Sequence, residues 1–168
     1  MYMPRDRDIL HRLQNQQGQT LPDLSLSFAR NVANGLLKIP DVLHVELFGS
    51  IARDEHGNDL CFLLVTGIEK YDEFYRRLKS VTDELKHKGY TYSSEEIRRM
   101  VISLVWNTHN PEWSEIQMFY QSNVHTDICV VPVGWREFWA ITWLQLAFDD
   151  TFIEKLYAEA RPIATRRN

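Results

Sequence analysis

Hydrophobic residues recur with a helical spacing in three segments of the chain. The segments are residues 22–40, 69–88 and 94–106, where apolar side chains lie three or four positions apart. This spacing puts the apolar side chains on one face of an α-helix, where a sheet or another helix can cover them. The inward positions that it predicts are Leu24, Phe28, Val32 and Leu36 in the first helix, and Ile97, Val101 and Leu104 in the third.

A second pattern, unbroken apolar runs that are bounded by turn-forming residues, predicts strands that are buried on both faces. The runs cover residues 42–48, 59–65 and 123–132. Because side chains alternate along a strand, Asp59 and Cys61 should share one face of the second strand. Asp127 and Cys129 should likewise share one face of the third. An acid is an unusual residue in such surroundings, since a buried carboxylate needs a partner or a metal ion.

The remainder of the chain is predicted to be mostly helical. Residues 134–160 have helical spacing, and three of the five tryptophans lie between Trp135 and Trp143. This Trp-rich segment is interpreted as core or as a surface for a partner protein or a second copy of the chain. Residues 110–120 fit a helix or a strand, and the helix-start residues Asn110–Pro111 favour the helix.

Together these elements predict an α/β (α+β) fold, in which a small mixed β-sheet is flanked by helices and followed by a helical C-terminal segment. Residues 21–168 are predicted to form a single domain that includes the C-terminal helices 134–160. Residues 1–20 are polar and rich in glutamine, so a loosely ordered N-terminal segment is expected.

Composition and charge narrow the class of protein. The chain is 44% hydrophobic and 25% charged, as is usual for a globular protein, and it has no apolar run of the roughly 20 residues that a membrane span needs. No secretory signal is recognised at the start, so a cytoplasmic location is expected. The net charge of -4 argues against broad electrostatic contact with nucleic acid. The two basic clusters, Arg98–Arg99 and the tail Arg161–Arg167, are predicted to be solvated surface.

The stretch that carries candidate chemistry is VELFGSIARDEHGNDLCFLLV, residues 45–65. An apolar strand runs into Gly49–Ser50, where glycine allows a sharp turn and the close approach of a ligand. Arg53 follows shortly after the turn, and Asp59 stands at the mouth of the next strand. Backbone amides and a guanidinium after such a turn are suited to a phosphate.

This stretch resembles the signature of the nucleotidyltransferase superfamily, the polymerase-beta-like enzymes that include the minimal nucleotidyltransferases. That signature is a strand, Gly-Ser, often Ala-Arg, and then Asp-x-Asp at the start of a second strand. The matching residues are Gly49, Ser50, Ala52, Arg53, Asn58, Asp59 and the run Leu63–Val65. Cys61 stands where the second acid of Asp-x-Asp is expected.

The resemblance implies a nucleotidyltransferase-like fold that binds a nucleoside triphosphate with a divalent metal and moves a nucleotidyl group to an acceptor. It implies that Gly49, Ser50 and Arg53 bind the nucleotide. It also implies that Asp59 and a third acid, for which Asp127 is the candidate, are catalytic and hold Mg²⁺. Stand-alone members often work with a helical partner protein.

Cys61 leaves several interpretations open. A thiol is a poor magnesium ligand, so an alternative is a catalytically impaired binding or regulatory module that acts through a partner protein. Asp59-x-Cys61 and Asp127-x-Cys129 could also form a soft-metal site if their strands are neighbours. The spacing lacks a CxxC element, so ordinary buried thiols are the preferred interpretation. His125, two positions before Asp127, is a candidate for supporting the acids.

Overall fold

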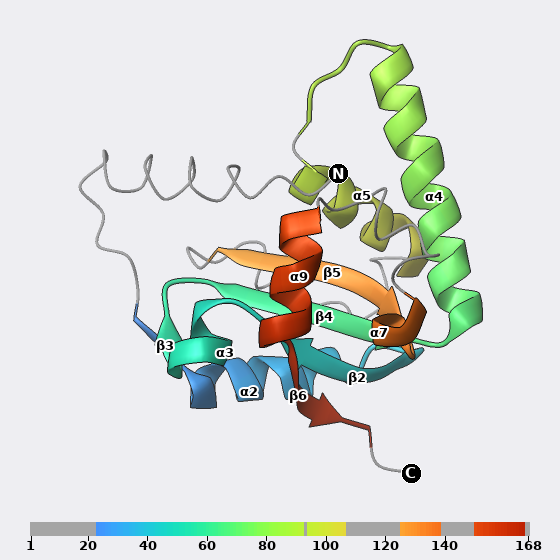
Figure 1. The fold of residues 1–168 in the computed structure, drawn as a ribbon. Coiled ribbons are helices and arrows are strands. Elements are labelled where there is room, and N and C mark those ends of the chain that lie inside the picture. The colour runs from blue at the N-terminus through green and yellow to red at the C-terminus, as the bar shows by residue number, and fades with distance from the viewer. Residues whose placement is uncertain (1–22, 93, 107–124, 139–149, 167–168) are drawn as a thin grey trace, which may run out of the picture.

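The computed structural model describes residues 23–92, 94–106, 125–138 and 150–166 and has a mixed α+β architecture (Figure 1). In chain order the elements are β1 (Leu24–Ser25), α2 (Leu26–Leu36), β2 (Val42–Leu47), α3 (Ser50–Asp54), β3 (His56–Gly57), β4 (Leu60–Thr66), α4 (Ile68–His87), α5 (Ser94–Trp106), β5 (Thr126–Pro132), α7 (Trp135–Phe138), α9 (Asp150–Glu159) and β6 (Arg161–Thr165).

The main sheet has four strands in the order β5-β4-β2-β6. Strand β2 is antiparallel to both β4 and β6, whereas β4 and β5 are parallel. Strands β1 and β3 form a separate antiparallel pair. The predicted mixed sheet flanked by helices is therefore confirmed at the level of fold class.

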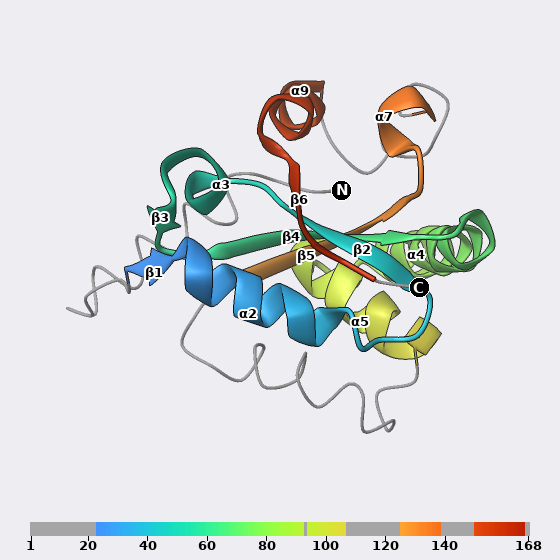
Figure 2. The same ribbon diagram turned by 90° about the horizontal axis from the view of Figure 1, so that it is seen from below.

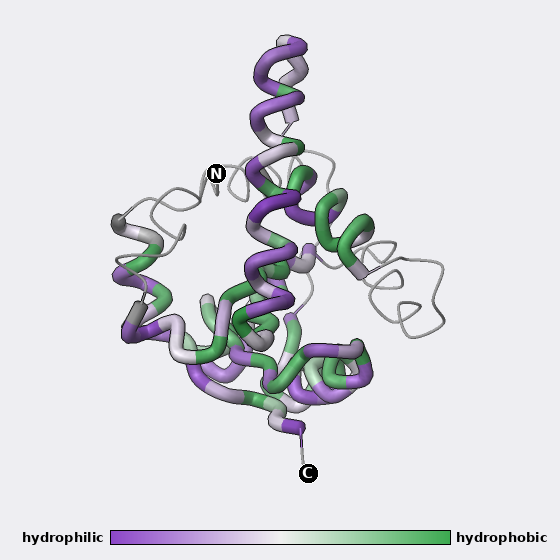
Figure 3. Tube along the Cα trace, turned by 90° about the vertical axis from the view of Figure 1, so that its right-hand side faces the viewer, coloured by the Kyte–Doolittle hydropathy of each residue, from purple (hydrophilic) through white to green (hydrophobic). Residues whose placement is uncertain are grey.

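Helices cover both faces of the main sheet (Figure 2). Helices α2 and α5 lie on one face, and α7 and α9 lie on the other. Helix α4 is anchored by its buried residues Tyr71, Phe74 and Leu78, and its C-terminal part extends beyond the sheet and consists mostly of hydrophilic residues (Figure 3). The pairing register puts Cys61 and Asp127 on one face, and Asp127 lies on the edge strand β5, where Arg98 of α5 contacts it.

The first helix begins later than its apolar spacing predicted. Ser25 caps α2, because its hydroxyl accepts a hydrogen bond of 3.1 Å from the Phe28 amide. Ala29 and Ala33 are fully buried in this helix, whereas Phe28 is 39% exposed. The prediction that Phe28 faces the core is therefore wrong, because small side chains let α2 approach the sheet closely. The same prediction for Leu104 on α5 is also wrong, since Leu104 is 54% exposed.

The basic tail forms a strand that the sequence analysis did not predict. Strand β6 pairs with β2, and Ala164 lies opposite Val45. Arg166 then donates hydrogen bonds to the carbonyl oxygens of Val42, at 2.9 Å, and Ile39, at 3.0 Å. The interpretation of the whole tail as solvated surface is wrong, because its backbone completes an edge of the sheet.

Several predictions fall on residues that the structure does not describe. They are the N-terminal segment 1–20, the ambiguous element 110–120, and Trp139 and Trp143 of the Trp-rich segment. Trp135 is described, and it is 1% exposed, so it belongs to the core and not to a partner surface. Among the helices that are described, none combines the length and apolarity that crossing a membrane requires.

Candidate functional site

The Gly-Ser turn after β2 lies directly against the start of β4. The amide of Phe48 donates a 3.0 Å hydrogen bond to the carbonyl oxygen of Cys61, which holds the turn in place. Gly49 has φ = 88°, a conformation that favours glycine. A Cβ atom at position 49 would lie 3.3 Å from the Sγ atom of Cys61. The backbone conformation therefore favours glycine, and a Cβ atom would in addition crowd the thiol of Cys61.

The two candidate acids lie on neighbouring strands, as the sequence analysis predicted. In the parallel pair β4–β5, Leu60 is opposite Thr126 and Cys61 is opposite Asp127. Asp59 therefore stands beside His125, and its Oδ2 atom is 3.7 Å from His125 Nδ1. Because side chains alternate, Asp59, Cys61 and Asp127 share one face of the sheet.

Asp127 is held by an arginine that the sequence analysis misassigned. Arg98 Nη2 donates a 2.6 Å hydrogen bond to Asp127 Oδ1, and the two side chains are 4% and 1% exposed. A buried carboxylate costs far less free energy when a guanidinium neutralises it. The prediction that Arg98 is solvated surface is wrong. Its position one helical turn before the buried Ile102 could have indicated that it faces inward.

The thiols stay close to the acids of their own strands. Cys61 Sγ lies 3.7 Å from Asp59 Oδ2, and Cys129 Sγ lies 4.0 Å from Asp127 Oδ1. Both cysteines are buried, and neither forms a disulfide bond. Within the described residues, no group of three or more His, Cys, Asp or Glu side chains is arranged to hold a metal ion. The alternative of a soft-metal site is therefore not supported, and ordinary buried thiols explain the two cysteines.

The donor set also fits Mg²⁺ poorly. Magnesium prefers oxygen ligands, and here two carboxylates stand among two thiols. The guanidinium of Arg98 already supplies a positive charge at Asp127, so a metal ion there would meet a cation. Magnesium at Asp59 and Asp127 stays a prediction from the resemblance, and the observed arrangement does not favour it.

A third carboxylate occupies the donors that were predicted to bind phosphate. Glu159, the last residue of α9, accepts a 3.1 Å hydrogen bond from the Gly49 amide through Oε2. Its Oε1 atom accepts a 2.7 Å hydrogen bond from Arg53 Nη1. The structure thus brings Gly49 and Arg53 together at one anion. Ser50 is adjacent, and its hydroxyl packs against Gly57, where a Cβ atom would collide with it.

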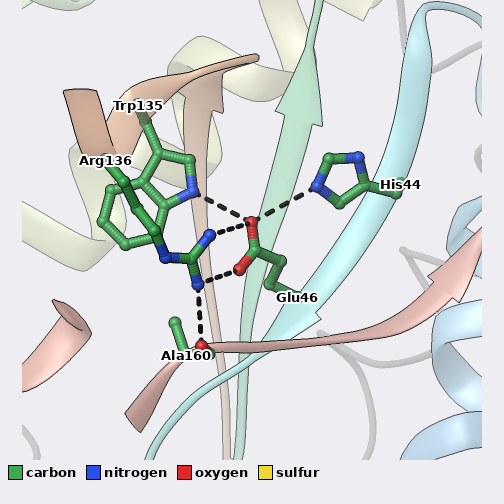
Figure 4. A network of polar contacts seen from close by, with 5 residues as sticks. All are labelled: His44, Glu46, Trp135, Arg136 and Ala160. Atoms are coloured by element: carbon green, nitrogen blue, oxygen red, sulfur yellow. Dashed lines mark hydrogen bonds and ion pairs between the residues drawn. The ribbon is translucent and has the colours of Figure 1, made fainter. Parts of the chain in front are cut away.

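A second polar cluster surrounds Glu46 of β2 (Figure 4). Glu46 lies opposite Leu63, which shares its face of β4 with Cys61. Glu46 accepts hydrogen bonds from Trp135 Nε1, at 2.9 Å, and from Arg136 Nη2, at 2.6 Å, and His44 Nε2 lies 3.3 Å away. Arg136 also donates a 2.7 Å bond to the carbonyl oxygen of Ala160. The cluster therefore ties α7 and the junction between α9 and β6 to β2.

The environment of Glu46 keeps it ionised. Burial raises its pKa, but the hydrogen bonds with His44, Arg136 and Trp135, together with the charge of Arg136, outweigh burial and lower the pKa to about 2. Neither Glu46 nor Glu159 was predicted from the sequence. Glu46 carried the same signal as Asp127, an acid within an apolar strand, whereas nothing near Glu159 in the sequence indicates its distant partners.

Comparison with known proteins found no family model, no curated protein and no solved structure that matches this chain. Function is therefore inferred from the arrangement of the residues themselves: the turn at Gly49, the acids on the neighbouring strands, and the carboxylate that the turn holds.

Proposed function

We propose that this chain has a nucleotidyltransferase-like fold and binds a nucleoside triphosphate at the Gly49–Ser50 turn, as a binding module with impaired transfer chemistry. The observation that carries the proposal is the convergence of separate parts of the signature. Gly49 packs on Cys61, Cys61 lies opposite Asp127, and Asp59 directly precedes the strand that carries Cys61. These are the positions that the resemblance assigns to nucleotide and metal binding.

The donors around the turn support binding of a phosphate group. The Gly49 amide and the Arg53 guanidinium already hold both oxygens of one carboxylate. Phosphate oxygens accept hydrogen bonds from the same donors, and hydrogen bonds between charged groups are stronger than neutral ones. Arg53 is 45% exposed at its side chain, so a ligand can reach it from solvent.

Two features favour a binding module over an active transferase. Cys61 takes the place of an acid, and Arg98 neutralises Asp127. Both reduce the negative charge that would hold divalent metal ions against a triphosphate. Transfer to an acceptor remains the second candidate, because Asp59 and Asp127 are retained on one face of adjacent strands. We also propose that the module acts through a partner protein, but we assign no surface of the chain to that partner.

The test is calorimetric titration of the chain with ATP and with GTP, once with Mg²⁺ and once with EDTA. Wild type should bind at least one of them, and Ser50→Ala/Arg53→Ala should bind it more weakly. Arg77→Ala, an exposed arginine on α4, is the matched control and should bind as wild type does. Absence of binding by wild type under both conditions would overturn the proposal. Formation of a nucleotidylated product would favour the transferase instead.

A further inference from the structure

Glu159 stands at a place where a carboxylate does not stabilise its own helix. It is the last residue of α9, and the C-terminal end of a helix carries a partial negative charge that disfavours acids. Its side chain is only 11% exposed, so it also loses hydration. The bonds to the Gly49 amide and Arg53 offset both costs. The position of Glu159 is therefore explained by the Gly-Ser turn and not by the helix.

The backbone beside Glu159 is fixed independently of its side chain. Arg136 donates a 2.7 Å hydrogen bond to the carbonyl oxygen of Ala160, and strand β6 begins at Arg161. The hydrogen bond and the strand pairing at the junction of α9 and β6 therefore do not involve the Glu159 side chain. Helix α3 has only five residues, so the anion is held by an amide and a guanidinium and not by a helix dipole.

We infer that Glu159 is an intramolecular competitor for the phosphate site, and that a ligand binds by displacing its carboxylate from Gly49 and Arg53. The inference rests on the proposed function. A carboxylate brings one negative charge and two oxygens, whereas a polyphosphate brings more of both to the same two donors. Glu159 therefore selects for polyphosphate groups, because a ligand with a single carboxylate gains nothing by replacing it.

The competition predicts that removing the charge of Glu159 tightens binding. Glu159→Gln keeps an oxygen for the Gly49 amide but loses the ion pair with Arg53, and Glu159→Ala loses both interactions. We expect ATP and inorganic tripolyphosphate to bind Glu159→Gln roughly twofold to fivefold more tightly than wild type, the range for a partly exposed ion pair. Glu159→Ala should bind at least as tightly. Glu154→Gln, an exposed glutamate on the same helix, is the matched control and should leave affinity unchanged.

Calorimetry of the whole 168-residue chain in EDTA measures these affinities, and thermal melting confirms that each variant folds. The amide resonance of Gly49 provides a second readout, which should change on adding tripolyphosphate to wild type. Equal affinity of wild type and Glu159→Gln would overturn the competition and leave the proposed function intact. Weaker binding by Glu159→Gln would overturn it too, because Glu159 would then belong to the ligand site. Failure of wild type to bind either ligand would overturn the proposed function itself.

Discussion

Two buried carboxylates on the same face of the sheet have arginine partners but different surroundings. Glu46 on β2 pairs with Arg136, and Asp127 on β5 pairs with Arg98, each at 2.6 Å. Glu46 lies among hydrogen-bond donors from the elements that it joins (Figure 4). Asp127 lies among thiols and opposite the strand that carries Asp59. An acid in an apolar strand thus predicts a buried polar centre, and its neighbours decide whether that centre is structural or chemical.

The largest effect is expected from a substitution that tests whether Asp127, like Glu46, serves to stabilise the fold. Arg98→Met would leave the Asp127 carboxylate buried without its cation, because both side chains are almost fully buried. We expect the free energy of unfolding to fall by roughly 3–5 kcal/mol, as when one partner of a buried ion pair is removed. Urea unfolding measures this, with Arg77→Met on the exposed side of α4 as the control.

The double variant Arg98→Met/Asp127→Leu sharpens the comparison, because it removes both charges. It should recover much of the loss, since apolar replacement of a buried pair is often nearly neutral. If Mg²⁺ alone restored the stability of Arg98→Met, the pair of Arg98 and Asp127 would not be purely structural. That result would indicate instead that Asp127 accepts a metal ion once the guanidinium is gone.

The second expected effect is the pH dependence that Glu46 contributes. Its pKa is about 2 in the folded protein against 4.5 for an unperturbed glutamate, so the folded state binds the proton less readily. The stabilisation is complete above about pH 4.5 and is lost as the pH falls toward 2. The shift corresponds to roughly 3 kcal/mol. Other carboxylates titrate in the same range, so the measured quantity is the difference between wild type and Glu46→Gln in urea unfolding at several pH values. Parallel pH profiles for the two proteins would contradict this account.

The spacing of hydrophobic residues predicted the helices and strands that have a buried side and an exposed side or are buried throughout. It did not predict structure that depends on backbone pairing or on contacts between residues far apart in the chain. The strands around Asp59 and Asp127 were predicted because their apolar runs are continuous. Strand β6 was missed because Arg161 and Pro162 give it no such run, although its backbone pairs with β2. Arg98 and Glu159 were missed because their partners lie 29 and at least 106 residues away in the chain.

The smallest expected effect concerns Cys61, the residue that departs from the nucleotidyltransferase signature. Cys61 is 1% exposed, and its thiol lies 3.7 Å from Asp59 Oδ2. In Cys61→Asp a second carboxylate would be buried beside the first, and the two would repel each other. We expect a loss of roughly 1–3 kcal/mol in the free energy of unfolding without metal. Cys61→Asn is the matched control, because it has nearly the same shape as aspartate without the charge.

Addition of Mg²⁺ with a non-hydrolysable triphosphate tests whether an acid at position 61 would complete a metal site. If the site keeps the geometry of a nucleotidyltransferase, the ligands should bind the restored pair of acids and raise the melting temperature of Cys61→Asp more than that of Cys61→Asn. The reason is linkage, since a ligand that binds only the folded state stabilises it. Equal responses of the two variants would contradict a latent metal site. The Gly49 amide and Arg53 would then bind an anion without any contribution from Asp59 and Asp127.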